Sequence, residues 1–244
     1  MPDRRSHRGP DPHDARAFGP DAHPALRAAV ADLSWLLDRG YTPVAASKLV
    51  GDRWRLSERQ RKATFRCACP DSRLAARLCH RIEPEELACE PLCLDGFNVL
   101  TTLEAALGGA VVLIGRDGCL RDIAGVHGTY RKVEETVPAA RLAGEVLEEL
   151  AVGVCTWLLD RPVSNSGRLR AVLLETAAAH GWDWRVELVA NPDAVLAESP
   201  EVVASADSVI LDRCSRWLNL ARLTVEARVS EAFLVDLRRE PQFA

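Results

Sequence analysis

Four aspartates of this chain each follow an apolar run of the length of a β-strand. PLCL leads into Asp95, TWLL into Asp160, WRVELVANP into Asp193 and EVVASA into Asp207. The carboxyl ends of parallel strands meet at one edge of a sheet, so we expect these carboxylates to lie together. Close carboxylates repel one another unless a cation lies between them, and oxygen ligands favour Mg²⁺ or Mn²⁺. Such a site suits phosphodiester hydrolysis, although each aspartate alone is also explained as a turn residue.

The elements that must position these aspartates are predicted by the rhythm of the sequence after residue 88. Apolar runs of strand length alternate there with helical stretches, which is typical of an α/β domain with a mainly parallel, Rossmann-like sheet flanked by helices. We place this domain at residues 88–230 and treat residues 231–244 as a C-terminal tail. An Asp-Gly pair between two apolar runs predicts a hairpin within residues 111–132.

Residues 25–87 are predicted to form a small helical module that precedes the α/β domain. Leu26, Val30, Leu33 and Leu37 recur at helical spacing. Thr42 and Pro43 mark the start of a second helix, and Ser57 and Gln60 have the spacing of a capping box for a third. Short helices joined by tight turns favour a helix-turn-helix-like bundle.

The third helix of this module is strongly basic. Its candidate phosphate contacts are Arg59, Arg61 and Lys62, which could hold RNA or DNA. The alternative is a solvated helix face. The whole chain has a net charge of −4, so any nucleic-acid contact must come from a local patch of this kind.

The acidic positions also carry a resemblance to a known group of domains. CLDGFNVL, TWLLD, NPDAVL and VVASADS resemble the motifs of NYN-type domains, which are relatives of the PIN nucleases. The resemblance implies that Asp95, Asp160, Asp193 and Asp207 bind metal and that Asn98 and Ser205 orient the site. The sequence departs from the NYN pattern at Pro192, where alanine is usual, and in the added segment 111–132.

A second resemblance covers most of the chain, from about residue 28 to residue 228. The stretch RGYTPVAASKLVGDRWRLSERQR, followed by the DGFN domain, resembles a prokaryotic family of unknown function. This match is more specific than the short nuclease motifs. It implies membership of that family and leaves the activity open.

Two further segments are candidates for binding substrate phosphate. Arg121 and Arg131 lie in the polar, glycine-rich segment 111–132, which we expect to be either a substrate loop or an ordinary surface hairpin. Ser164, Asn165 and Ser166 precede a helix that starts near Arg168. They are expected either to hold a phosphate at the helix N-terminus or to cap that helix.

Composition indicates a cytoplasmic protein without a membrane segment. Residues 1–24 are polar, rich in proline and histidine, and predicted to form a disordered tail rather than a secretory signal. No apolar run reaches the roughly 18 to 20 residues that a spanning helix needs. Zinc is not expected, because the spacing of the cysteines between residues 67 and 93 is not that of a zinc site.

Three functional hypotheses remain at this stage. The first is a metal-dependent nuclease or phosphoesterase acting on RNA or DNA, with Asp95, Asn98, Asp160, Asp193 and Asp207 as its catalytic group. The second is a non-catalytic module of the same fold that binds a nucleotide or another phosphorylated ligand. The third is an interaction protein whose helical region docks a partner. A need for all four acids together with a metal would favour the first hypothesis.

Overall fold

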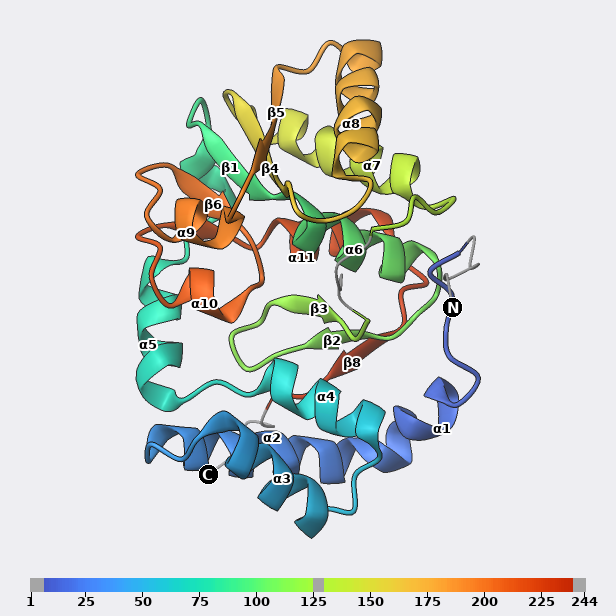
Figure 1. Cartoon of the computed structure of the whole chain (residues 1–244), viewed down its shortest axis with the longest axis vertical. Coiled ribbons are helices and arrows are strands. Elements are labelled where there is room, and N and C mark those ends of the chain that lie inside the picture. Colours follow the sequence, from blue (N-terminus) through green and yellow to red (C-terminus); the bar gives the residue numbers. More distant parts are fainter. Residues whose placement is uncertain (1–6, 125–129, 239–244) are drawn as a thin grey trace.

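A computed structural model describes residues 7–124 and 130–238 (Figure 1). Its larger sheet has five parallel strands in the order β5-β4-β1-β6-β7. The strands are β1 (Leu92–Asp95), β4 (Cys155–Asp160), β5 (Trp184–Val189), β6 (Val202–Ala204) and β7 (Trp217–Leu218). This confirms the predicted α/β class with a parallel, Rossmann-like sheet, and β1 lies at the centre of the sheet.

Helices cover both faces of this sheet (Figure 1). Leu92 and Leu94 of β1 and Trp157 of β4 lie in the core cluster shared with one group of helices. Those helices are α6 (Gly96–Leu107), α7 (Thr136–Glu149), α8 (Ser166–His180) and α11 (Leu220–Arg228). Cys93 and Leu158 lie on the opposite face, beneath the short helices α9 (Pro192–Ala197) and α10 (Ser208–Leu211). Since strand side chains alternate between faces, Asp95 and Asp160 belong to the face of α9 and α10.

A second sheet has three strands in the order β3-β2-β8. Strands β2 (Val112–Ile114) and β3 (Leu120–Asp122) form the predicted hairpin, whose turn includes Gly118 at a φ of 78°. Strand β8 (Leu234–Asp236) pairs in parallel with β2. We had assigned residues 231–244 to a tail. Up to residue 238 this was wrong, because β8 completes the small sheet and its Val235 lies in the core. Residues 239–244 lie outside the described residues.

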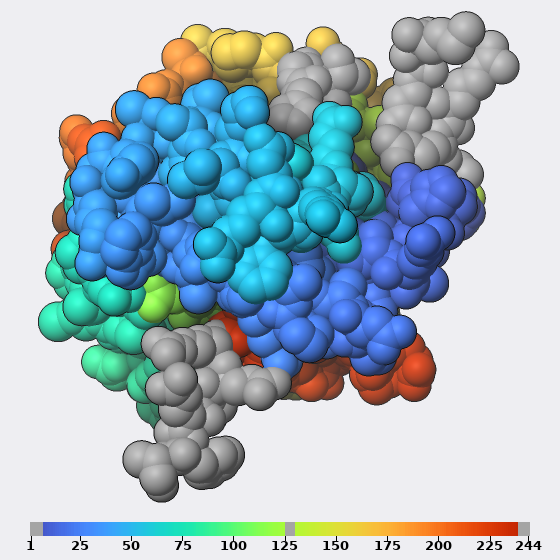
Figure 2. Space-filling view, turned by 90° about the horizontal axis from the view of Figure 1, so that it is seen from below, coloured from blue at the N-terminus to red at the C-terminus, as the bar shows by residue number. Residues whose placement is uncertain are grey.

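The helical region forms a layer on the small sheet, which Figure 2 shows from outside in blue and cyan. It contains α2 (His23–Asp38), α3 (Pro43–Arg53), α4 (Glu58–Cys67) and α5 (Asp71–His80), and a 3₁₀ turn at Pro84–Leu87 follows. The predicted cap at Thr42 and the capping box of Ser57 and Gln60 are both present. Leu26 and Leu33 share a core with Val111, Leu113 and Val235. The helical region and the small sheet therefore form one packing unit.

The segment before residue 25 differs from the expected disordered tail. Residues 7–24 are described and contain α1 (Asp14–Ala17) and a 3₁₀ turn at Pro20–Ala22. Phe18 is fully buried in the helical core, and buried Asp14 accepts hydrogen bonds of 2.6 and 2.9 Å from Arg59. Phe18 and Asp14 thus attach this segment to the helical region. Residues 1–6 lie outside the described residues.

In the described ranges, 7–124 and 130–238, no helix has the length and apolar character that crossing a membrane requires.

Candidate functional site

Asp95 is at the centre of the site, at the carboxyl end of the middle strand. Its carboxylate accepts a hydrogen bond of 2.7 Å from the Ser205 hydroxyl and one of 3.3 Å from the backbone N–H of Asn98. The register explains the first bond, because Cys93 pairs with Val203 and two residues further on Asp95 lies opposite Ser205. Asp95 also caps α6, which begins at Gly96. The local sequence DGFN therefore fixes the carboxylate at the edge of the sheet.

Asn98 and Ser205 connect Asp95 with the turn that follows β6. The Asn98 side-chain oxygen accepts a hydrogen bond of 2.9 Å from the Ala206 backbone N–H. The Ser205 hydroxyl accepts one of 3.0 Å from the Asp207 N–H, and Asp207 in turn caps α10 through a 2.7 Å bond from the Val209 N–H. Both polar residues that we expected to orient the site therefore contact Asp95 or the backbone next to Asp207.

The other two predicted acids approach from neighbouring strands. Asp160 ends β4, the neighbour of β1, and is partly exposed. Asp193 is exposed in the first turn of α9, which follows β5 and packs against β1, β4 and α10. Asn191 caps this helix with a 3.2 Å bond to the Ala194 N–H. The crossing from β5 to β6 thus carries Asp193 back over the middle of the sheet.

The four carboxylates influence one another electrostatically. Burial raises the pKa of Asp95 to about 7, and the charges of Asp207 and Asp193 contribute, while the Ser205 hydrogen bond opposes the rise. Burial also raises the pKa of Asp193, with contributions from Asp207 and Asp160. Burial raises the pKa of Asp160 as well. Asp207 and Asp193 are therefore near enough to affect the pKa of Asp95, and Asp160 is near enough to affect that of Asp193.

The buried acids of the rest of the molecule show what is unusual about Asp95. Among the described residues, the other five buried acids each lie beside a basic side chain, in the pairs Asp14–Arg59, Glu104–Arg8, Asp117–Arg121, Asp122–Arg66 and Glu135–His7. Asp95 is only 7% exposed and has no such partner in the part of the chain described. A buried carboxylate without a compensating charge is unfavourable, so its ionised form needs a cation from outside the chain.

The donor set suits a hard divalent cation, since all four carboxylates are oxygen ligands. As the side chains stand, no three histidine, cysteine or acidic residues in the described ranges converge on one metal position. Asp193 is exposed and Asp160 is partly exposed, so their side chains can rotate toward Asp95. Mg²⁺ or Mn²⁺ therefore fits the chemistry of the site, provided that these side chains move.

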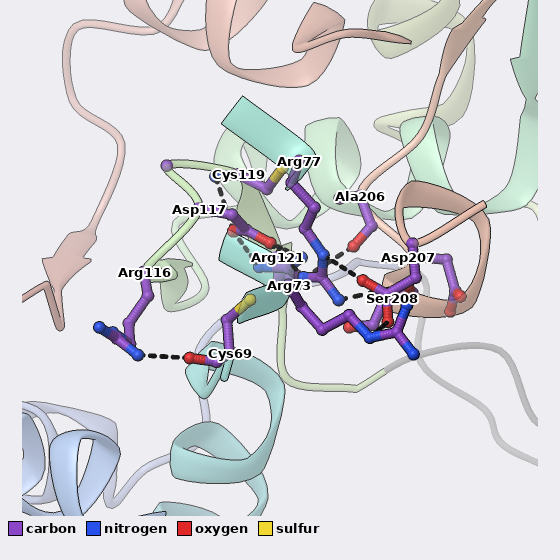
Figure 3. Close-up of polar contacts among 12 residues, drawn as sticks. Cys69, Arg73, Arg77, Arg116, Asp117, Cys119, Arg121, Ala206, Asp207 and Ser208 are labelled. Atoms are coloured by element: carbon purple, nitrogen blue, oxygen red, sulfur yellow. Dashed lines mark hydrogen bonds and ion pairs between the residues drawn. The ribbon is translucent and has the colours of Figure 1, made fainter. Parts of the chain in front are cut away.

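Arg121 does not lie where we expected it. It is 4% exposed, and its guanidinium donates two 2.7 Å hydrogen bonds to Asp117 and one of 2.8 Å to the carbonyl of Ala206 (Figure 3). A direct contact of Arg121 with substrate phosphate is therefore excluded in this arrangement. The physical reason is the hairpin turn. It brings Asp117, four residues earlier in the chain, into contact with the Arg121 guanidinium.

The loop after Asp160 is bonded mainly to the segment that starts at Tyr130. The Asn165 side chain donates a 2.9 Å hydrogen bond to the Tyr130 carbonyl, and the Ser164 carbonyl accepts one of 3.2 Å from the Tyr130 N–H. Ser166 is buried, and Asn165 does not cap α8 with its side chain. Arg131 is exposed beside this loop. Of these four phosphate candidates, Arg131, Ser164 and Asn165 are exposed and only Ser166 is buried.

The basic residues of α4 bind the protein itself. Arg59 pairs with Asp14, and Arg61 pairs with Asp52 at 2.8 Å and contacts the Leu56 carbonyl. Lys62 donates to the Ala124 carbonyl at 3.0 Å, and its pKa is lowered by burial and by the charge of Arg66. In the structure, all three basic side chains that we expected to contact phosphate are bonded to other parts of the protein. These side chains attach α4 to α1, α3 and the hairpin.

An ion-pair network beside the site joins Arg77, Asp117 and Asp212, none of which was expected among the site residues. Arg77 of α5 is buried and donates to Asp117 at 2.6 Å, to Asp212 at 2.7 Å and to the Ser208 carbonyl at 3.2 Å (Figure 3). Nothing in the spacing of α5 distinguishes Arg77 from its exposed neighbours. The Asp-Gly turn at Asp117 predicted the hairpin but gave no sign of this ion-pair network.

Two family models match different parts of the chain. The model of the domain of unknown function DUF5616 matches residues 84–223, more than half of the chain. The chain belongs to this family. A second model, of the protein of unknown function DUF434, matches residues 25–79 of the DUF5616 chain, which comprise α2 to α5 apart from their ends.

One curated relative is an uncharacterized protein of Methanocaldococcus jannaschii. It is 30% identical over 187 residues, which cover 77% of the DUF5616 chain and 89% of the relative. No solved structure matches the chain. The comparisons thus confirm the predicted membership of a family of unknown function.

Proposed function

We propose that the carboxyl edge of the five-stranded sheet is the active site of a metal-dependent phosphodiesterase that acts on RNA or DNA. The observation that carries the proposal is Asp95. It is a buried carboxylate with no basic partner in the described chain, and the charges of Asp207 and Asp193 lie close enough to raise its pKa. A hard divalent cation supplies the missing positive charge.

Each residue has a defined task in this proposal. Asp95, Asp160, Asp193 and Asp207 would hold Mg²⁺ or Mn²⁺. Asn98 and Ser205 keep Asp95 and the following turn in register through bonds of 2.7–3.0 Å. The bound cation lowers the pKa of a water molecule and neutralises charge that develops on the phosphate.

The pKa of Asp95 couples cation binding to pH. With a pKa of about 7, Asp95 is largely protonated in slightly acidic solution, and a cation must displace this proton. Metal affinity is therefore expected to fall by about tenfold for each pH unit below 7 and to level off above it. A cluster of four ordinary surface aspartates would instead keep its affinity down to about pH 5.

The nucleic-acid substrate is supported by the four motifs that resemble NYN and PIN domains and by Arg131. This arginine is exposed and follows Tyr130, which is bonded to the loop after Asp160; in this proposal it meets a substrate phosphate. The basic helix α4 does not support it, since its side chains bind the protein itself.

Calorimetry with Mn²⁺ tests the site directly. The wild type is expected to bind at pH 8, and Asp95→Asn is expected to lose most of this binding. Asp183→Asn is the matched control, because Asp183 is exposed and precedes β5 at the opposite edge of the same sheet. No binding by the wild type at millimolar Mn²⁺, or equal binding by Asp95→Asn, would refute the metal site.

Hydrolysis is then measured with fluorescent single-stranded RNA, structured RNA and DNA in the presence of Mn²⁺ or of EDTA. Cleavage that needs the metal and is lost in Asp95→Asn and Asp207→Asn, but kept in Asp183→Asn, supports the nuclease. Metal binding without cleavage of any of these substrates would leave a metal-binding module and contradict the enzymatic part of the proposal.

A further inference from the structure

The turn formed by residues 205–208, between β6 and α10, is held by two buried arginines from outside the five-stranded sheet and the helices that cover it. Arg121 of the hairpin donates to the Ala206 carbonyl at 2.8 Å, and Arg77 of α5 donates to the Ser208 carbonyl at 3.2 Å (Figure 3). Asn98 accepts from the N–H of Ala206. The carbonyl groups of Ala206 and Ser208, the residues on either side of Asp207, are therefore bonded to fixed side chains.

The two arginines are themselves held in place by a single buried carboxylate. Asp117 is 1% exposed and accepts two bonds of 2.7 Å from Arg121, one of 2.6 Å from Arg77 and one of 3.2 Å from the Cys119 N–H. Burial alone would raise the pKa of Asp117, but the two arginines outweigh it and keep that pKa well below its usual range. Asp212 accepts a further 2.7 Å bond from Arg77. The positive charges of Arg77 and Arg121 are thus balanced by the negative charges of Asp117 and Asp212.

This network joins three separate parts of the molecule. Arg77 comes from the helical region, Asp117 and Arg121 come from the hairpin, and the groups that they hold belong to the turn at the candidate site. Asp117 fixes the orientation of both guanidinium groups, and their other N–H groups then donate to the carbonyls of the turn. The 205–208 turn therefore depends on residues that are remote from the carboxylates in sequence.

We propose that Arg121, Arg77 and Asp117 are positioning residues, which hold the 205–208 turn so that Asp207 and Ser205 face Asp95. This inference rests on the proposed metal-dependent function. It gives the hairpin and the end of the helical region a role in the site. None of the three residues is one of the four proposed metal ligands. Metal affinity should then depend on Arg121. Its side chain bonds the Ala206 backbone and not the side chain of a proposed metal ligand.

The test compares Mn²⁺ affinity in Arg121→Met and Arg66→Met. Arg66 is the matched control, because it pairs with Asp122 of the same strand and makes no bond to the turn. Arg121→Met is expected to weaken Mn²⁺ binding at least about tenfold, and Arg66→Met to change it by no more than about twofold. Arg121→Lys keeps the charge and one donor, so it is expected to restore part of the affinity.

Loss of folding is separated from loss of position by a charge-balanced variant. Arg121→Met together with Asp117→Asn removes one positive and one negative charge and leaves the pair of Arg77 and Asp212 intact. It is expected to fold and to bind Mn²⁺ as weakly as Arg121→Met. Wild-type affinity in this double variant, or an equal loss in Arg66→Met, would overturn the positioning role while leaving the metal site established.

A wild type that binds no Mn²⁺ would overturn the proposed function instead, and the positioning role would then be tested without metal. Hydrogen exchange of the Ala206 and Asp207 amides measures whether the turn is still held, because these amides donate to Asn98 and Ser205. Exchange is expected to be faster in Arg121→Met and unchanged in Arg66→Met. Unchanged exchange in Arg121→Met contradicts the role.

Discussion

Replacing Asp95 by asparagine is expected to stabilise the metal-free protein at alkaline pH, although it removes a central residue of the site. Burial, Asp207 and Asp193 raise the pKa of Asp95 from 3.8 to about 7. Between these two pH values the folded protein holds a proton that the unfolded chain has lost. The free energy of unfolding of the wild type therefore falls as pH rises through this window. Asparagine does not ionise, so the variant does not lose this stability.

The size of the effect follows from the shift of about three pKa units. At 1.4 kcal/mol per unit, ionised Asp95 costs the folded protein about 4 kcal/mol above pH 7. At pH 5 the same linkage gives about 1–2 kcal/mol, so the difference between the two pH values is about 2–3 kcal/mol. Any constant effect of the amide on the Ser205 hydrogen bond is the same at both pH values and cancels.

Urea unfolding in EDTA at pH 5 and pH 8 measures this difference. The free energy of unfolding of Asp95→Asn, relative to wild type, should increase by about 2–3 kcal/mol from pH 5 to pH 8. Asp183→Asn should show no such change. If Asp95→Asn differs from wild type equally at both pH values, Asp95 is not an uncompensated buried carboxylate, and the main support for a cation site is lost.

Two further predictions concern packing elsewhere in the molecule. Asp14→Ala should lower the free energy of unfolding by about 1–3 kcal/mol in urea, because it removes the two bonds from Arg59; unchanged stability would show that residues 7–24 do not pack. Gly144→Ala should cost about 1–3 kcal/mol and change tryptophan fluorescence, because a Cβ there meets the Trp182 ring. Gly167→Ala, with open space around it, is the control, and an equal loss there would contradict the prediction.

Much of the α/β domain could be predicted because the relevant signals are local. An apolar run that ends in Asp-Gly before a helical stretch predicts both a strand and a helix start, and the structure has β1 and α6 there. The capping box at Ser57 is equally local. Parallel strands bring their carboxyl ends to one edge, so Asp95, Asp160 and Asp207 could be grouped without knowing the strand order.

The basic residues show where this kind of inference stops. A charged helix has the same pattern whether its arginines meet solvent, nucleic acid or acidic residues of the same chain. Arg59 lies 45 positions from its partner Asp14, and Arg121 lies 85 positions from the Ala206 carbonyl. No local spacing reports a pair of that kind, so these side chains were assigned to phosphate when they serve the fold.

The sequence by itself determined most helices and strands and which strands are followed by an aspartate. These features depend on hydrophobic periodicity and caps, which act within a few residues. Only the tertiary structure decided which charges are neutralised inside the protein. It gave Asp117 two arginines and left Asp95 without a basic partner in the described chain. Charge compensation depends on contacts between remote segments, and in this protein it distinguishes the buried acids of the fold from the carboxylate proposed to bind a cation.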